Sequence, residues 1–175
     1  SPVEVVKGVN LSKVFTYLSD VTRKDTIVTN GAGNYAAWLH RFFKHKTYRT
    51  QLAPTSGAMG YGVPAGIAAK LIHPDRMVIS VSGDGCFLMC GQELATAARY
   101  GANVIFIVVD NGVYGTIRMH QERDYPDRVS GTDLTNPDFK TYAESFGALG
   151  LLVEHEDDFP AAFKQAKRAN KLTLI

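Results

Sequence analysis

Hydrophobic and polar positions follow two alternating patterns along the chain. Short runs rich in β-branched residues predict strands, and residues 104–109 are apolar throughout, as in a parallel strand that is covered on both faces. Between these runs, apolar residues recur at helical spacing. The predicted strands are residues 26–29, 77–81, 104–109, 149–153 and 172–175. The predicted helices are residues 11–19, 35–43, 60–72, 91–100, 137–146 and 159–169, with Asn10 capping the first and Asn34 the second.

The alternation of strands and helices predicts the fold class. Strands that are separated by helices of this length imply right-handed crossover connections between parallel strands. We therefore expect an α/β fold with an open, mostly parallel twisted sheet and helices on both faces. In such a sheet, ligands bind in the crevice at the carboxyl ends of the strands.

The length of the chain sets its domain organisation. At 175 residues with no internal repeat or linker, residues 1–175 are predicted to form one domain. The chain begins at Ser1 instead of a methionine and ends in the apolar run 172–175, which resembles a strand cut in mid-course. We therefore expect a segment excised from a longer, multidomain chain.

Charge and cysteine content narrow the range of partners. The net charge is only +2, which predicts neither a nucleic-acid nor a membrane partner. Residues 40–49 interleave basic and aromatic side chains, a pattern that can bind nucleic acid, but the near-neutral total favours a solvated helix end. Cys86 and Cys90 have no second pair, so small core thiols and a reducing, cytoplasmic compartment are expected.

Polar residues follow two of the predicted strands. Gly83-Asp84-Gly85 comes after the strand at 77–81, and Asp110-Asn111-Gly112 comes after the strand at 104–109. If these strands are neighbours, about 4.8 Å apart, Asp84 and Asn111 project into one crevice. Helix N-termini behind the loops suit phosphate, so the set describes a Mg²⁺ site shared with a phosphorylated ligand. The alternative is a pair of ordinary turn-forming Asx-Gly loops.

The two loops also carry a resemblance to a known family. Gly83-Asp84-Gly85, 25 further residues and then Asn111 resemble the thiamine diphosphate motif. Residues 55–65, 91–97 and 111–115 extend the likeness. The chain resembles the C-terminal, diphosphate-binding domain of thiamine diphosphate-dependent enzymes, in the acetolactate synthase-like branch.

The resemblance implies a set of site residues. The side chains of Asp84 and Asn111 and the carbonyl of Val113 would bind Mg²⁺, and the backbone N–H groups of Gly85 and Cys86 would bind the diphosphate. The Gly57 carbonyl would accept a hydrogen bond from the aminopyrimidine, and Met59 would support the bend of the cofactor. The other implied cofactor-binding residues are Gly33, Asn34, Tyr35, Ala58, Gly83, Tyr114 and Gly115, among which Asn34 and Tyr35 replace a Gln-His pair of the family.

The activity that the resemblance implies is decarboxylation of a 2-oxo acid, followed by transfer or ligation of the acyl unit. The family's catalytic glutamate belongs to a pyrimidine-binding domain of the same or a partner subunit, in a homodimer or homotetramer, and FAD can bind the full-length enzyme. No glutamate here lies in a segment that resembles that domain, so the chain alone is expected to be inactive. These glutamates are Glu4, Glu93, Glu122, Glu144, Glu154 and Glu156.

Three alternatives accompany this interpretation. His120 stands where biosynthetic acetolactate synthases carry a tryptophan near the substrate, which leaves open a non-acetolactate 2-oxo acid decarboxylase or C–C lyase. A non-catalytic binding module that retains the fold is also open. Residues 31–36 fit a dinucleotide-binding pattern, but no Asp or Glu occurs between Thr26 and Pro74, where the ribose-binding acid would stand.

Overall fold

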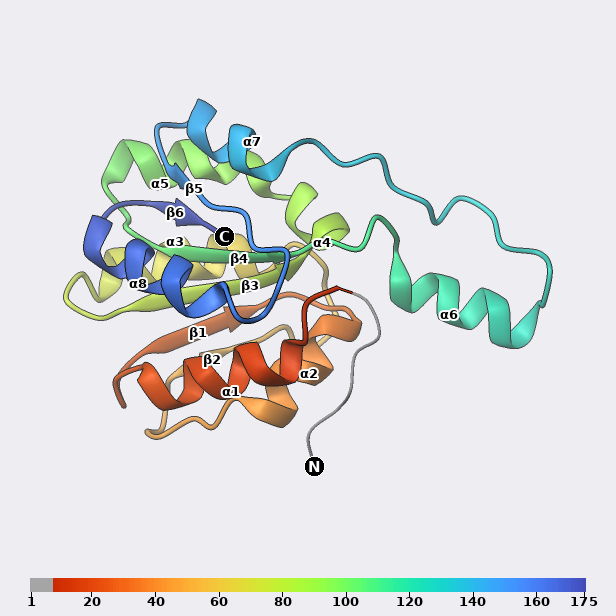
Figure 1. Cartoon of the computed structure of the whole chain (residues 1–175), viewed down its shortest axis with the longest axis horizontal. Helices are drawn as coiled ribbons and strands as arrows, with labels where there is room; N and C mark the ends of the chain where they lie inside the picture. The colour runs from red at the N-terminus through yellow and green to blue at the C-terminus, as the bar shows by residue number, and fades with distance from the viewer. Residues whose placement is uncertain (1–7) are drawn as a thin grey trace.

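The computed structural model describes residues 8–175, which fold around one six-stranded sheet (Figure 1). The strand order is β2-β1-β3-β4-β6-β5, and every neighbouring pair is parallel. This confirms the predicted open, parallel α/β fold. The strands are β1 (Ile27–Asn30), β2 (Gln51–Leu52), β3 (Val78–Gly83), β4 (Ile105–Val109), β5 (Leu149–Gly150) and β6 (Thr173–Leu174).

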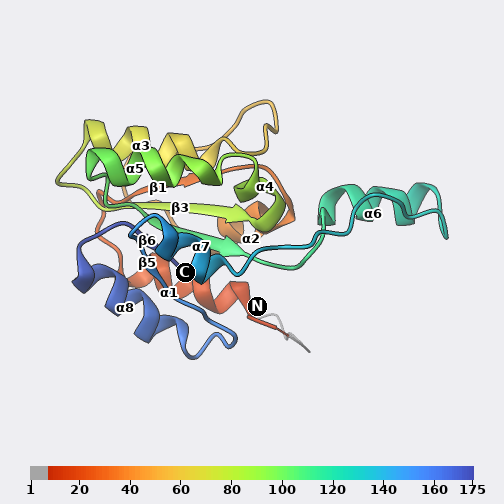
Figure 2. The same cartoon turned by 90° about the horizontal axis from the view of Figure 1, so that it is seen from above.

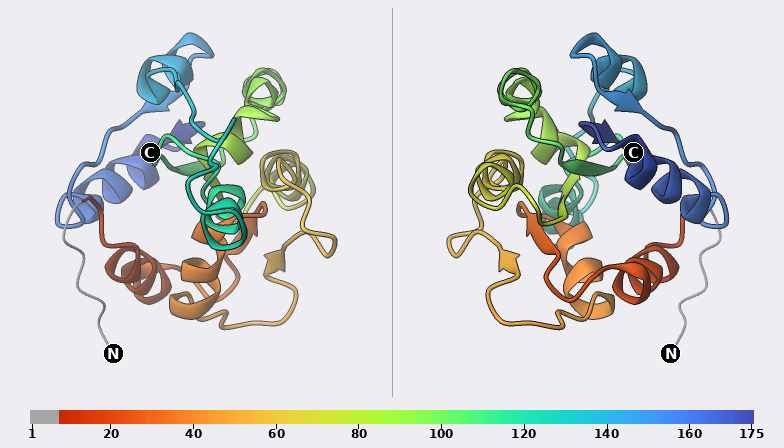
Figure 3. Two further views of the ribbon diagram at one scale, coloured as in Figure 1. Left: turned by 90° about the vertical axis from the view of Figure 1, so that its right-hand side faces the viewer. Right: turned by 90° about the vertical axis from the view of Figure 1, so that its left-hand side faces the viewer.

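Helices cover both faces of the sheet. Helices α3 (Gly62–Ile72) and α5 (Leu94–Tyr100) lie on one face, and α1 (Leu11–Val21) and α8 (Phe159–Ala169) lie on the other (Figures 2 and 3). The remaining helices are α2 (Asn34–Phe42), α4 (Asp84–Leu88), α6 (Gly115–Asp124) and α7 (Phe139–Ser145), and a 3₁₀ turn, η1, spans Gly91–Glu93. No helix within residues 8–175 has both the length and the apolar character that crossing a bilayer requires.

The central strands explain the continuous apolar runs of the sequence. Successive side chains of a strand point to opposite faces of the sheet. In β4, Ile105 and Ile107 therefore pack with α1, α2 and α8, whereas Phe106 packs with α3, α5 and α7. Both faces of the strand are buried, so no polar position interrupts it.

The capping predictions had different outcomes. Asn10 caps α1, since its Oδ1 accepts hydrogen bonds from the backbone N–H groups of Ser12 at 3.0 Å and Lys13 at 3.4 Å. The predicted Asn34 cap is wrong, because α2 begins at Asn34 and Gly33 occupies the cap position without a side-chain bond. The Asn34 Oδ1 instead accepts a hydrogen bond from the hydroxyl of Thr116 at 2.9 Å.

Three elements escaped the sequence pattern. Strand β2 consists of two exposed residues, α4 has only five residues, and α6 buries none of its side chains. None of these elements has enough apolar positions for the spacing of a strand or a helix to be recognised in the sequence. The predicted helix at 91–100 is divided into η1 and α5.

Glu156 connects the segment before α8 to the start of α1. Its carboxylate accepts hydrogen bonds from Lys13 Nζ at 2.9 Å and from the backbone N–H of Asn10 at 3.2 Å. These donors, Lys13 first, lower the pKa of Glu156 from 4.5 to about 2. Because the folded pKa is depressed, the carboxylate stabilises the fold above pH 4.5, and this contribution is lost as the pH falls toward 2.

We predict that Glu156→Gln lowers the melting temperature at pH 7 and that this difference shrinks between pH 4.5 and pH 2. Thermal unfolding followed by circular dichroism over this pH range tests the prediction. Glu154→Gln is the matched control, since Glu154 is exposed on the same segment. A difference that does not depend on pH would contradict the role of the carboxylate.

Candidate functional site

The candidate site lies where β1, β3 and β4 end. Gly83 pairs in register with Val109, so Asp84 and Asp110 come directly after two paired positions. The chain leaves β1 into α2, which packs in the core on one face. It leaves β3 toward α5, which packs on the other face. Connections that diverge in this way open a crevice at the carboxyl ends of the strands.

A cavity of about 300 Å³ occupies this edge of the sheet. Every predicted cofactor-binding residue lines it except Ala58, which is exposed between Gly57 and Met59. Sequence reasoning missed the other lining residues, which are Leu11, Ala32, Trp38, Val109, Thr116 and Ile117. The fold thus brings the predicted residues together, and their individual roles stay predictions.

Asp84 joins the two strand-end loops. Its side chain is buried, and Oδ1 accepts a hydrogen bond from the N–H of Gly85 at 2.8 Å. Oδ2 accepts hydrogen bonds from the N–H groups of Gly112 at 2.8 Å and Asn111 at 3.3 Å. The carboxylate is therefore held in one orientation by donors from both loops.

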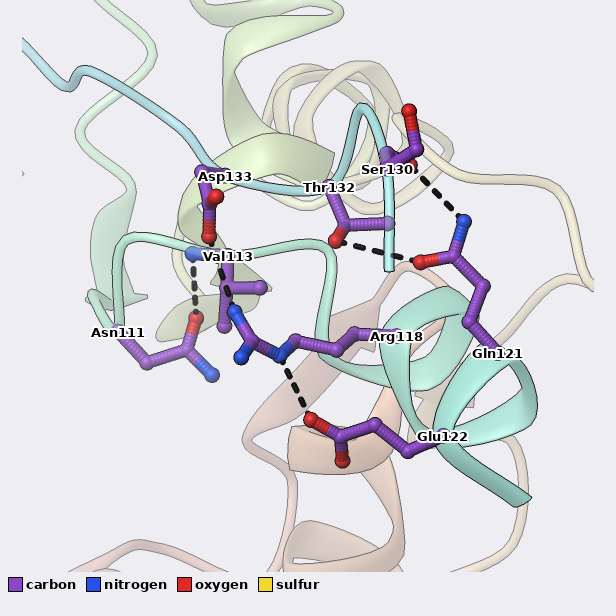
Figure 4. Close-up of polar contacts among 8 residues, drawn as sticks. All are labelled: Asn111, Val113, Arg118, Gln121, Glu122, Ser130, Thr132 and Asp133. Atoms are coloured by element: carbon purple, nitrogen blue, oxygen red, sulfur yellow. Dashed lines mark hydrogen bonds and ion pairs between the residues drawn. The ribbon is translucent and has the colours of Figure 1, made fainter. Parts of the chain in front are cut away.

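Asn111 and Val113 present oxygens on the same side of the second loop. The Asn111 Oδ1 accepts a hydrogen bond from the Val113 N–H at 3.2 Å (Figure 4). Val113 also forms an antiparallel bridge with Asp133, and the flanking bonds run from Tyr114 to Thr132 and from Leu134 to Gly112. In this type of pair, the central residue's own N–H and C=O point away from the partner strand. The Val113 carbonyl therefore faces the side where the Asn111 carboxamide lies.

Two helix N-termini begin at the cavity. Gly33 precedes α2 and Tyr114 precedes α6, and neither provides a side-chain cap. Unpaired N–H groups and the partial positive charge of a helix start favour an anion. The Gly85 N–H, which was predicted to bind diphosphate, donates to the Asp84 carboxylate in this structure.

Cys86 ties three segments of the site together. Its buried Sγ accepts hydrogen bonds from the Tyr35 hydroxyl at 3.3 Å and the Gly60 N–H at 3.1 Å. Burial, reinforced by Cys86, raises the pKa of Tyr35 far above its ordinary value, so the hydroxyl keeps its proton and donates. A Cβ on Gly31 would lie 2.2 Å from this sulfur, which leaves room only for glycine. Cys86 thus positions the start of α2 and the segment that contains Gly57 and Met59.

Sequence reasoning also missed two polar residues beside Asp84. Asn136 Nδ2 donates hydrogen bonds to Asp84 Oδ2 at 2.8 Å and to Asp110 Oδ1 at 2.7 Å. Burial and the neighbouring Asp84 raise the pKa of Asp110. The position of Asp110 directly before Asn111 could have identified it. Asn136 is 52 residues from Asp84, and no local pattern marks it.

The other candidate residues lie away from the cavity. His120 is exposed on α6, and its Nδ1 accepts a hydrogen bond from Arg123 Nη2 at 2.8 Å. None of the glutamates within residues 8–175 lines the cavity, and Glu4 lies outside the described residues. That part of the chain also holds no group of three or more His, Cys, Asp or Glu side chains placed to bind a metal. A metal ion here would therefore need amide and carbonyl oxygens beside Asp84.

The fold and this edge of the sheet define an α/β domain with a cavity at its topological switch point, in which a few polar groups stand among apolar walls. Residues 31–175 match the family model described as thiamine pyrophosphate enzyme, C-terminal TPP binding domain. The chain belongs to this family, as the sequence resemblance predicted (thiamine pyrophosphate is thiamine diphosphate).

Individual relatives point the same way. The chain is 33% identical over 175 residues to acetolactate synthase of Bacillus subtilis, covering 99% of this chain and 29% of that protein. It is 38% identical over 158 residues to a probable acetolactate synthase large subunit of Methanocaldococcus jannaschii, covering 89% of this chain and 27% of the relative. The chain therefore spans less than a third of the length of these relatives.

A solved structure is also similar over the whole chain. It is the thiamine diphosphate-dependent 4-hydroxybenzoylformate decarboxylase of Rhodococcus jostii RHA1, with a TM-score of 0.91 and 31% sequence identity. The match covers 100% of this chain and 33% of that one.

We predict that Cys86→Ala destabilises the fold by about 1–3 kcal/mol, because the buried Tyr35 hydroxyl and Gly60 N–H lose their acceptor. Cys86→Ser, which keeps an acceptor, should cost less. Urea unfolding measures both changes. Cys90→Ala is the control, since this second free cysteine is less buried. Equal losses at the two cysteines would contradict the proposed importance of the acceptor.

Proposed function

We propose that this chain is the diphosphate- and Mg²⁺-binding domain of a longer thiamine diphosphate-dependent enzyme that acts on 2-oxo acids. The observation that carries the proposal is the grouping of Asp84, Asn111 and Val113 in one cavity beside two uncapped helix starts. A carboxylate, a carboxamide oxygen and a carbonyl oxygen are hard ligands that suit Mg²⁺ shared with phosphate. The donor set therefore fits the group that the family binds.

The roles follow the chemistry of the lining. Asp84, Asn111 and the Val113 carbonyl would hold Mg²⁺, and the start of α2 at Gly33 and Asn34 would hold the diphosphate, together with the backbone of residues 83–86 and 114–115. Gly57 and Met59, which line the cavity, would contact the rest of the cofactor. When bound, thiamine diphosphate supplies a carbon nucleophile for the 2-oxo carbonyl and stores the electrons released with CO₂.

The chain's own residues prepare the cavity for this chemistry. Asp84 is already fixed by the N–H groups of Gly85 and Gly112, one from each loop, so little reorganisation accompanies metal binding. Leu11, Trp38 and Ile117 give the cavity an apolar wall, which limits water around the reacting carbon and strengthens electrostatic interactions within the site.

The rest of the enzyme lies outside this chain. Because none of the described glutamates lines the cavity, the catalytic acid would come from a pyrimidine-binding domain of the same or a partner subunit. We accordingly propose a cytoplasmic homodimer or homotetramer in which residues 1–175 form one domain and FAD can bind elsewhere. A non-catalytic module of the same fold would lack that glutamate and turn over no 2-oxo acid.

Two observations keep the choice of substrate open. The relatives cited are acetolactate synthases, which favours decarboxylation of pyruvate followed by carboligation. The similar solved structure is a 4-hydroxybenzoylformate decarboxylase, and His120 replaces the expected tryptophan, which favours a decarboxylase or C–C lyase. Assays of the intact enzyme with pyruvate, benzoylformate and glyoxylate, scored for both CO₂ and carboligation products, separate these candidates.

We predict that Asp84→Ala weakens the Mg²⁺-dependent binding of thiamine diphosphate at least about tenfold, because Asp84 is the only carboxylate among residues 8–175 that lines the cavity. Isothermal titration calorimetry of the intact protein measures the affinity. Asp75→Ala is the control, since Asp75 is exposed in the loop before β3, at the opposite end of the strand. Equal affinity in the wild type and Asp84→Ala would overturn the proposed function.

A further inference from the structure

Residues 114–138 form a long excursion that leaves the site after Val113 and returns to it before α7. After Val113 it runs through α6, away from the sheet, and returns as an extended segment to α7 (Figure 1). Arg118 binds Glu122 at 2.9 Å and Asp133 at 3.0 Å, and Gln121 binds the Ser130 carbonyl at 2.9 Å (Figure 4). The Arg118–Asp133 and Gln121–Ser130 contacts hold the outgoing and returning limbs of the excursion to each other, whereas the Arg118–Glu122 pair lies within α6.

Asn136 is where the returning limb reaches the floor of the site. Its Nδ2 donates one hydrogen to Asp84 Oδ2 at 2.8 Å and the other to Asp110 Oδ1 at 2.7 Å. The Gly112 N–H reaches the same two oxygens, at 2.8 Å and 3.2 Å. The Oδ2 of Asp84 and the Oδ1 of Asp110 thus share two donors, the Asn136 amide and the Gly112 N–H.

The chemistry of these groups makes the amide hard to replace. Two neighbouring ionised carboxylates repel each other by their like charges. Because each can only accept hydrogen bonds, a donor that lies between them offsets part of this repulsion. An amide nitrogen carries two hydrogens and no charge of its own. The Asn136 Oδ1 is buried without a hydrogen-bond partner among the described residues. The side chain keeps this orientation because the flipped amide would turn that oxygen toward the two carboxylates.

We infer that Asn136 is a positioning residue for the metal site. Its amide keeps the Asp84 carboxylate in the orientation that binds the metal, despite the charge of Asp110, and it fastens the returning limb to the loop that contains Asn111 and Val113. The inference rests on the proposed function, because it assigns the role of Asn136 through Asp84.

The test is a Mg²⁺ titration of the intact protein at a fixed concentration of thiamine diphosphate, with binding followed by calorimetry. We expect Asn136→Ala to raise the Mg²⁺ concentration at half-saturation about tenfold, as is typical when a group that orients a metal ligand is lost. Thr135→Ala is the matched control, since Thr135 is exposed on the same limb, and its half-saturation should equal that of the wild type. Asn136→Ser serves where the alanine variant does not fold, and it should also raise the value.

Asp110→Asn isolates the charge argument. With one carboxylate removed and a second amide beside Asp84, the added effect of Asn136→Ala should fall below about threefold, as a double-mutant cycle measures. A purely structural role would lower the melting temperature of Asn136→Ala and leave the Mg²⁺ half-saturation unchanged, which would overturn the inference. An undiminished effect in the Asp110→Asn background would also overturn it. Failure of the wild type to bind thiamine diphosphate with Mg²⁺ would instead contradict the proposed function.

Discussion

The structure of this site depends on the parallel register of two strands. Gly83 pairs with Val109, and the next residue of each strand is an aspartate. The register therefore brings Asp84 and Asp110 together at one edge of the sheet. Asp84 then accepts hydrogen bonds from both loops. The two loops are therefore held together by a carboxylate instead of by apolar packing. A change of register by one residue would turn one of these side chains to the opposite face.

The sequence was sufficient for the features that the sheet itself determines. Asp84 and Asn111 could be placed in one crevice because each lies within two residues of the end of a buried strand, and such strands show clearly as uninterrupted apolar runs. Asn10 could be identified as a cap because the apolar period of α1 begins just after it. Gly57 and Met59 depended on the resemblance to a family, since no local periodicity connects that segment with the strand ends.

The features that the sequence did not reveal come from contacts between distant segments or from the lack of a buried face. Asn34 is a good cap by residue type, but its side chain instead binds Thr116 of α6, and the helix begins one residue earlier than predicted. Helix α6 has no apolar face because it buries no side chain. Asn136 could not be found because its partners are fixed only once the excursion has returned to the sheet. Tertiary contacts determine the roles of Asn34 and Asn136, whereas α6 escaped prediction because it has no buried face.

The floor and the outer wall of the cavity are therefore stabilised by different interactions. The floor is made by β3, β4 and the buried residues around Cys86, which belong to the packed core. The outer wall includes Thr116 and Ile117 of α6, where ion pairs between exposed side chains take the place of core packing. Exposed pairs contribute little to stability, and regions with few buried contacts open at lower free energy than the core. The position of Thr116 and Ile117 consequently depends on the contacts that join the excursion to the residues of the floor. Among these contacts, the Asn136 side chain bonds directly to Asp84.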